Sequence, residues 1–427
     1  MAVGAEHWRP EQVLSTKGRG MSSPLTIVIV GASLAGAKTA EALREQGFDG
    51  RVVLVGAEQH LPYERPPLSK GYLLGSEARD KVFVHPQSWY DDHDVDLRLR
   101  TVVTALDRVA HRVTTGAGEE LGYDKLVLAT GSSPRLLTLP GADLPGVYYL
   151  RTLDDSDALK EALQPGARVV VIGGGWIGLE TAAAARTAGA EVVVLEYAQQ
   201  PLLRVLGPQI APVFAGLHRD HGVDLRVGVE VARLGARDDG SVGEVVLTDG
   251  TSVPADVVIA GVGITPNTGL AEQSGLTTDD GVLVDAQLRS SDPDVHAVGD
   301  VANAFHPFYG RHLRVEHWAN ALNQPSVAAA ALLGGDRTYD RLPYFFTDQY
   351  DLGMEYTGFA QPDDSVVVRG DLATRTFIAF WLREGRVTAG MNVNVWDVTK
   401  PIKQLITQGR TVDVSRLADA DLPLDEV

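Results

Sequence analysis

Short apolar runs alternate with alanine-rich segments over the first part of the chain. Thr26–Val30 is a run of mostly β-branched residues that ends at a glycine, and Arg51–Val55 is a second such run. Between them, Ala37–Gln46 carries alanine and leucine at helical spacing and stops at Gly47. Short, uninterrupted apolar runs predict strands buried on both faces of a parallel sheet. This segment therefore predicts a strand, a turn, a helix and a second strand.

The same pattern occurs again about one domain length later. Arg168–Ile172 and Glu191–Leu195 predict strands, and Leu179–Thr187 predicts the helix between them. Other periodic segments predict three more strands and a long helix, at Lys125–Ala129, Asp256–Ala260, Val295–Val298 and Leu313–Leu333. We therefore predict an α/β chain with two Rossmann-like dinucleotide-binding domains.

Beyond Pro343 the chain changes character, because aromatic residues become frequent and polar and apolar positions alternate. This predicts a smaller C-terminal α+β domain, which we expect to serve dimerisation or shielding. We expect a flexible tail at residues 1–20. The expected domains are a first dinucleotide-binding domain at 21–135 and 265–338, a second at 136–264, and the C-terminal domain at 339–427.

Composition narrows the function further. The net charge of −18 disfavours nucleic acid as a partner, and an acidic protein partner would need a local basic patch. The 427 residues include no cysteine, which excludes a disulfide framework, a cysteine-ligated zinc or iron–sulfur site and a dithiol relay. The histidines lack metalloprotease spacing, so we expect no metal site. With no bilayer-length apolar stretch and no signal peptide, we expect a cytoplasmic protein without membrane contact.

Gly173–Gly178 matches the G-x-G-x-x-G fingerprint in full, between a predicted strand and a predicted helix. Gly173 would permit the tight turn, Gly175 the approach of backbone to a pyrophosphate, and Gly178 the close packing of helix on strand. Glu196 ends the next strand, where such folds place the acidic residue that binds the ribose hydroxyls of NAD. The alternative is a glycine-rich turn without a ligand.

Gly31–Gly36 is a weaker copy, because Ser33 replaces the middle glycine. Alone, it fits a nucleotide site and a structural turn equally well. Two later segments favour the nucleotide site. Ala129–Gly131 offers small residues after a buried strand, and Asp300 places a carboxylate where it could bind a sugar-chain hydroxyl. The alternative role for Asp300 is a helix N-cap.

Three longer motifs add a family resemblance. Leu61–Lys70, with the sequence L-P-Y-E-R-P-P-L-S-K, resembles the signature of bacterial ferredoxin reductases of the putidaredoxin reductase type. Glu316–Gln324 and Phe345–Tyr350 resemble later motifs of the same flavoprotein family, and the likeness covers nearly the whole chain. These reductases supply electrons to haem-thiolate monooxygenases and ring-hydroxylating dioxygenases. The resemblance implies FAD and NADH as cofactors.

The resemblance also implies where these cofactors bind. Lys70 would lie beside the isoalloxazine ring and stabilise the anionic reduced flavin, and Glu180 would pair with it near the nicotinamide. The alternatives are a solvated lysine and a first-turn helix carboxylate. The first fingerprint would hold the FAD pyrophosphate. The residues implied for FAD are Gly31, Ala35, Gly36, Ala57 or, preferably, Glu58 at the ribose, Lys70, Val103 near the adenine, Ala129, Arg135 near the phosphates, Asp300 at the ribityl chain and Trp318 at the flavin. Those implied for NADH are Gly173, Gly175, Ile177, Gly178, Glu196 and Gly263.

Without cysteines, electrons must leave the flavin directly for a one-electron carrier, such as a ferredoxin, another small iron–sulfur protein or rubredoxin. We therefore expect an NADH-dependent ferredoxin reductase of an oxygenase system, present as a monomer or weak homodimer. One alternative is an enzyme similar to monodehydroascorbate reductase or NADH oxidase. Another is a redox-linked signalling flavoprotein of the apoptosis-inducing-factor type.

Overall fold

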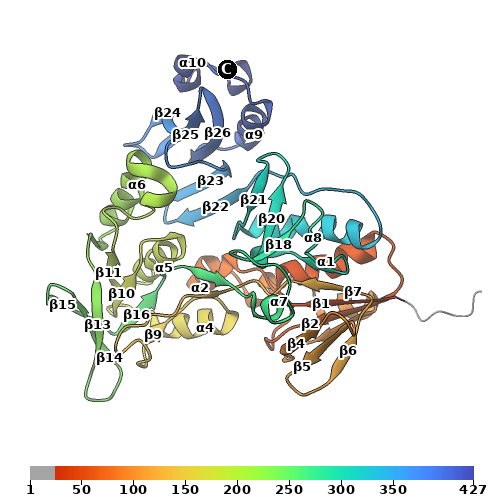
Figure 1. Cartoon of the computed structure of the whole chain (residues 1–427). Helices are drawn as coiled ribbons and strands as arrows, with labels where there is room; N and C mark the ends of the chain where they lie inside the picture. The colour runs from red at the N-terminus through yellow and green to blue at the C-terminus, as the bar shows by residue number, and fades with distance from the viewer. Residues whose placement is uncertain (1–24) are drawn as a thin grey trace, which may run out of the picture.

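The computed structural model describes residues 25–427, which contain two parallel five-stranded sheets and one antiparallel five-stranded sheet (Figure 1). The tail predicted at residues 1–20 lies outside the described residues. None of the described helices is long and apolar enough to cross a membrane.

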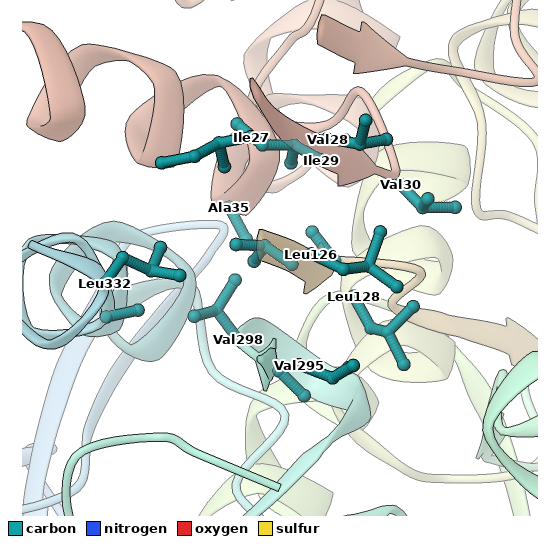
Figure 2. Close-up of a cluster of buried hydrophobic side chains, with 14 of the residues drawn as sticks. Ile27, Val28, Ile29, Val30, Ala35, Leu126, Leu128, Val295, Val298 and Leu332 are labelled. Carbon is teal, nitrogen blue, oxygen red and sulfur yellow. The ribbon is translucent and has the colours of Figure 1, made fainter. Parts of the chain in front are cut away.

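The first parallel sheet and the two helices packed beside it consist of β1 (Thr26–Val30), β2 (Arg51–Val55), β3 (Val95–Arg98), β7 (Lys125–Leu128), β19 (Val295–Ala297), α1 (Leu34–Glu45) and α8 (Trp318–Leu332). The strand order is β19-β7-β1-β2-β3, and every neighbouring pair is parallel. Side chains from β1 and β7 meet Ala35 of α1 and Leu332 of α8 in one buried cluster (Figure 2). The sheet thus combines strands from both segments of the first predicted dinucleotide-binding domain, 21–135 and 265–338.

The second parallel sheet and its helices consist of β9 (Val147–Tyr148), α4 (Leu153–Ala162), β10 (Arg168–Ile172), α5 (Trp176–Thr187), β11 (Glu191–Glu196), α6 (Leu203–Asp220), β12 (Asp224–Val227) and β16 (Val257–Ala260). The strand order is β12-β11-β10-β16-β9, again with parallel pairs. In each sheet a strand, a glycine-turn helix and the next strand occupy equivalent places, so the chain contains the same unit twice.

Each unit also carries a three-stranded antiparallel sheet inserted before a core strand. These are β4 (Val103–Asp107), β5 (Arg112–Thr115) and β6 (Glu120–Gly122), and β13 (Val231–Ala236), β14 (Val242–Leu247) and β15 (Ser252–Pro254). The two units are joined by an antiparallel pair, β8 (Ser132–Pro134) with β17 (Ile264–Pro266). The predicted boundary at 265 falls within β17, and the one at 135 falls directly after β8. The remaining elements of this part are α2 (Gly71–Leu74), α3 (Gln87–Asp92), α7 (Gly269–Gln273), β18 (Val282–Val284), β20 (Ala302–His306) and β21 (Arg311–Leu313).

The C-terminal domain is built from β22 (Tyr344–Gln349), β23 (Leu352–Gly358), β24 (Ser365–Asp371), β25 (Thr376–Arg383), β26 (Arg386–Val393), α9 (Thr399–Gln408) and α10 (Val414–Ala418). Its antiparallel sheet has the order β22-β23-β26-β25-β24. One face, with Met354 and Phe377, shares a core with α5 and α6, and the other face, with Phe380, packs on α9. The α/β fold with two Rossmann-like domains and a C-terminal α+β domain is thus confirmed.

The long helix predicted over Leu313–Leu333 is wrong at its start. Leu313 ends β21, and α8 begins only at Trp318 after an extended segment in which His317 is the N-cap. The intervening side chains turn to the cavity described below, and Arg314 forms ion pairs with Asp280 and Glu316. Helices α1 and α5 begin earlier than predicted, because the glycine turns lead into them without further residues.

Candidate active site

One cavity of about 1300 Å³ lies between the two units and the C-terminal sheet. Both glycine turns face it, since Gly31, Ser33 and Ala35 line it together with Gly173 and Gly175. The structure therefore brings together two motifs that are far apart in the sequence. A cavity of this size, reached by two helix N-termini, can hold two elongated anionic molecules in contact with each other.

The first glycine turn places backbone where side chains would not fit. Gly31 has a φ of +117°, and a Cβ there would lie 2.1 Å from the carbonyl oxygen of Ala129. A Cβ on Gly36 would lie 1.9 Å from the carbonyl oxygen of Gly31. Ser33 is the N-cap of α1, but its side chain caps no N–H group of the described chain. The first N–H groups of α1 therefore remain available to a phosphate.

The second glycine turn repeats this construction and adds a carboxylate. Gly173 has a φ of +104°, and a Cβ on Gly178 would lie 2.0 Å from the carbonyl oxygen of Gly173. Glu196, at the end of β11, accepts a hydrogen bond from the N–H of Gly174 at 2.5 Å and one from the N–H of Ala198 at 2.7 Å. Its side chain is thus held at the mouth of the turn, where it lines the cavity.

Lys70 and Glu180 meet inside the cavity, as the family resemblance implies. Lys70 Nζ lies 2.7 Å from Glu180 Oε2, and only 4% of the Glu180 side chain is exposed. The same carboxylate accepts hydrogen bonds from the hydroxyls of Ser69 and Thr347, each at 2.5 Å. The geometry contradicts both alternatives, since the Lys70 side chain is only 17% exposed and Glu180 is the fifth residue of α5, beyond its first turn. Ser69 and Thr347 were not predicted, because nothing in the local sequence relates them to Glu180.

Asp300 forms an ion pair with Arg151, whose Nη2 lies 2.8 Å from Asp300 Oδ2. It lies within a short 3-10 turn, Gly299–Val301, whose N-cap is Val298, so the alternative role as a helix N-cap is wrong. Arg151 was not predicted. Its Nε is buried without a hydrogen-bond partner in the described chain, and the residue lines the cavity.

Glu58 also lines the cavity, but protein groups already occupy much of its carboxylate. Arg65 Nη2 lies 3.1 Å from Glu58 Oε1, and the Tyr63 hydroxyl donates to Glu58 Oε2. Burial raises the pKa of Tyr63, so this hydroxyl remains a donor. Glu58 therefore has fewer free lone pairs for a ribose than the sequence suggests, whereas its neighbour Ala57 lines the cavity with backbone and a methyl group.

The start of α8 faces the cavity with Trp318 and His317. The Trp318 indole donates to Glu64 Oε2 at 3.0 Å, which holds the first turn of the helix in place. Burial lowers the pKa of His317 to about 4, so its imidazole is neutral at pH 7. Its Nδ1 is buried and has no partner among the described residues. Such an atom pairs with a bound group or with a water molecule in the cavity.

Three further predicted site residues line the cavity, namely Ala129, Ile177 and Gly263. Gly36 and Gly178 do not line it, since they serve as spacers beneath the turns. Val103 opens β4 outside the lining, and Arg135 donates from its Nε to the carbonyl oxygen of Ile264 at 3.1 Å. Contacts of these last two residues with a cofactor remain predictions.

These residues fit FAD and NADH. A Cβ would clash with backbone at Gly31, Gly36, Gly173 and Gly178, so the backbone of each turn packs closely. Two helix N-termini are open to phosphates, and Arg151 Nε and His317 Nδ1 are buried atoms without a partner in the described chain. Within residues 25–427, no group of acidic or histidine side chains is arranged to hold a metal ion.

A family model for pyridine nucleotide-disulphide oxidoreductases matches residues 25–325. The chain belongs to this family. A second model, for a reductase C-terminal domain, matches residues 344–427 and thus the antiparallel sheet domain of this oxidoreductase. Membership confirms an oxidoreductase that uses FAD and a nicotinamide dinucleotide. In contrast to the family name, the chain contains no cysteine and hence no redox disulphide.

Several known relatives of this oxidoreductase are similar over almost their whole length. It is 43% identical to the ferredoxin–NAD(+) reductase component of the anthranilate 1,2-dioxygenase system of Burkholderia cepacia, over 93% of this chain and 98% of the relative. It is 38% identical to putidaredoxin reductase of Pseudomonas putida, over 95% of this chain and 97% of the relative. The reductase in a crystal structure of a covalent putidaredoxin reductase–putidaredoxin complex superimposes with a TM-score of 0.92 at 38% identity, covering 95% of this chain and 98% of that one. The resemblance predicted from the three motifs is confirmed.

Proposed function

We propose that this chain takes a hydride from NADH and passes electrons through FAD, one at a time, to a ferredoxin-type iron–sulfur protein that feeds an oxygenase. Relatives with this printed role are similar over nearly their full length. The observation that carries the proposal is the shared cavity, in which two dinucleotide-type turns and the Lys70–Glu180 pair meet in a chain without cysteine. The balanced reaction is NADH plus two oxidised ferredoxins to NAD⁺, two reduced ferredoxins and one proton.

When bound, FAD supplies the ability to accept a hydride and to release single electrons. The residues of the chain bind FAD and NADH and orient them toward each other. The first N–H groups of α1 hold the FAD pyrophosphate, and Asp300 accepts hydrogen bonds from the ribityl hydroxyls. Lys70 presents a cation to the part of the cavity where negative charge develops on reduction. Glu180 partly neutralises this cation and orients it.

The NADH pyrophosphate binds at the first turn of α5, beside Gly173, Gly175 and Ile177. Glu196 accepts hydrogen bonds from the adenosine ribose. This division of labour corresponds to an FAD-binding domain at 21–135 and 265–338, an NAD-binding domain at 136–264 and a C-terminal domain at 339–427. The β8–β17 ribbon supports these boundaries, because it is where the chain passes between the two parallel sheets.

We further propose that the protein works in the cytoplasm as a monomer or weak homodimer. The acceptor should dock on a locally basic surface, because the chain as a whole carries a net charge of −18.

The test of the proposed function is anaerobic reduction of the purified protein. The protein should be yellow, should contain one non-covalent FAD per chain and should bleach when one equivalent of NADH is added. A colourless protein that takes up no FAD on reconstitution would overturn the proposal, as would a bound flavin that NADH leaves oxidised.

A further inference from the structure

The third family motif, Phe345–Tyr350, lies in and just after β22, and the proposed function leaves it without a role. Its side chains alternate, so that Thr347 and Gln349 are buried on one face of the strand while Asp348 is exposed on the other. Both buried residues are only 1% exposed. Buried polar side chains are almost always hydrogen-bonded, so their partners indicate what this face does.

Three hydrogen bonds form a chain that runs from His218 through Gln349 and Thr347 of β22 to Glu180. The Thr347 hydroxyl donates to Glu180 Oε1 at 2.5 Å, and Gln349 Nε2 donates to Thr347 Oγ1 at 3.2 Å. Behind them, His218 Nε2 of α6 lies 2.9 Å from Gln349 Oε1. An amide oxygen can only accept, so the His218 ring donates through Nε2. This ring is neutral, because burial lowers the pKa of His218 to about 4.

All three bonds therefore run in one direction, toward the carboxylate. Each donor is polarised by the donor behind it, so the bonds strengthen one another. A carboxylate oxygen accepts hydrogen bonds, so a chain of donors that ends on it fixes its orientation. The other carboxylate oxygen, Oε2, receives the Ser69 hydroxyl and the Lys70 ammonium. Glu180, on α5 of the second unit, is thus held by donors from the first dinucleotide-binding unit and from the C-terminal sheet.

We propose that Thr347, Gln349 and His218 are positioning residues that hold the Glu180 carboxylate, and through it the Lys70 ammonium, in the arrangement that hydride transfer to the flavin requires. The inference rests on the proposed function. None of the three side chains lines the cavity, so they act through Glu180 and not on the cofactors directly. The C-terminal domain, for which the sequence suggests only dimerisation or shielding, then contributes to the chemistry.

Thr347→Val tests this directly, because it removes the hydroxyl and nearly preserves the shape of the side chain. In the FAD-loaded protein we expect the stopped-flow rate of flavin reduction by NADH to fall by about tenfold or more, which corresponds to the loss of one charge-assisted hydrogen bond. The Kd for NADH should stay within about twofold of the parent value, since the cavity lining is unchanged. Thr347→Ser restores the hydroxyl and should restore the rate.

The midpoint potential of the bound flavin gives a second readout, which a merely structural role would not move. Thr347→Val should shift it in the same direction as Glu180→Gln, and adding Thr347→Val to Glu180→Gln should cause little further shift. Gln349→Leu, one hydrogen bond further away, should give a smaller change of the same sign. It serves as the replacement test if Thr347→Val does not fold.

The matched control is Thr388→Val in the same sheet. Thr388 Oγ1 donates to the carboxylate of Asp364 at 2.7 Å, but neither residue lines the cavity. This variant should match Thr347→Val in thermal stability and leave the reduction rate and potential unchanged. Equal behaviour of Thr347→Val and Thr388→Val, in a parent protein that NADH does reduce, would overturn the inference while leaving the proposed function intact. A parent protein that binds no FAD would instead overturn the proposed function.

Discussion

The carboxylate of Glu196 is held by the turn that it serves, through hydrogen bonds from the N–H groups of Gly174 and Ala198. Each oxygen keeps lone pairs for the ribose hydroxyls of NADH, whereas a 2′-phosphate would meet its negative charge. The following residues, Tyr197–Gln200, carry no cation to pair with such a phosphate, and the nearest one along the chain is Arg204 at the cavity wall. We therefore expect this turn to discriminate between the two coenzymes.

We expect NADH to exceed NADPH in kcat/KM by at least about tenfold, since a hydrogen bond to a charged group contributes roughly 1.5–3 kcal/mol. Glu196→Ser should narrow this gap, mainly by improving NADPH. Glu191→Ser, at the exposed first position of β11, is the control and should change neither coenzyme. Equal use of both coenzymes by the parent protein would show that Glu196 has no part in the choice.

Asp300 offers a second test on a single side chain. Asp300→Ala removes the proposed partner of the ribityl hydroxyls and leaves Arg151 without its counter-ion in a part-buried site. The Kd for FAD should rise by about tenfold or more, measured by fluorescence titration of the reconstituted apoprotein. Asp294→Ala removes a comparable ion-pair partner, that of Lys125, away from the cavity and should leave FAD affinity unchanged. Similar affinities for the parent and Asp300→Ala would contradict the assigned contact.

Among the elements, the two glycine-turn helices depend most closely on the identity of single residues. In Gly178→Ala, the new Cβ would lie 2.0 Å from the backbone oxygen of Gly173, and backbone cannot move aside as a flexible side chain can. We expect a loss of about 1–3 kcal/mol in the free energy of unfolding and a weaker Kd for NADH. Gly269→Ala, in α7, meets no heavy atom within 4 Å in the described structure and is the control. Equal urea midpoints for the two variants would contradict the close packing of α5 on its turn.

Strand β19 contains a buried histidine, His296, whose two ring nitrogens have no partner among residues 25–427. Burial, assisted by Arg289 and Lys125, lowers the pKa of His296 to about 3. Below about pH 6.5 the imidazole takes up a proton in the unfolded chain but not in the folded chain. The free energy of unfolding therefore falls as the pH is lowered, and at pH 5 it is roughly 2 kcal/mol below its value at pH 8. In urea unfolding at pH 8 and pH 5, His296→Leu should lose less stability than the parent. His312→Leu, at an exposed position, should lose as much as the parent. Identical pH dependence in all three proteins would contradict this assignment.

The strands most visible in the sequence are those buried on both faces. β1, β2 and β10 match their predicted bounds because their β-branched side chains leave no polar interruption. The small antiparallel sheets were not predicted, since strands such as β6 and β15 are too short to show an alternating pattern. The start of α8 was placed too early because the sequence before Trp318 has helical composition, while its backbone is extended toward the cavity.

At the scale of the whole molecule, the candidate site too could be predicted only in part from the sequence. Both glycine turns and the Lys70–Glu180 pair could be predicted, because local motifs or the family resemblance carry them. Arg151, Ser69 and Thr347 could not, because each meets its partner only when distant parts of the chain pack together. Two of these contacts join the dinucleotide-binding units to each other, and the third, from Thr347, joins the second unit to the C-terminal sheet.

Across the whole molecule, no thiol is present that could accept the electrons that enter from NADH. The family is named for disulphide chemistry, and this chain has no cysteine with which to perform it. We therefore expect the flavin to be the last redox centre within the chain, from which the proposed ferredoxin carries the electrons away.

Electron transfer through the flavin to a ferredoxin can be tested by NADH-driven reduction of cytochrome c, measured with and without an added two-iron ferredoxin. We expect little reduction without ferredoxin, a rate that rises and saturates with ferredoxin concentration, and no effect of pretreating the reductase with a thiol-alkylating reagent. Slow turnover that ferredoxin does not accelerate, together with a long-lived charge-transfer absorbance after NADH is added, would contradict it and favour a signalling flavoprotein.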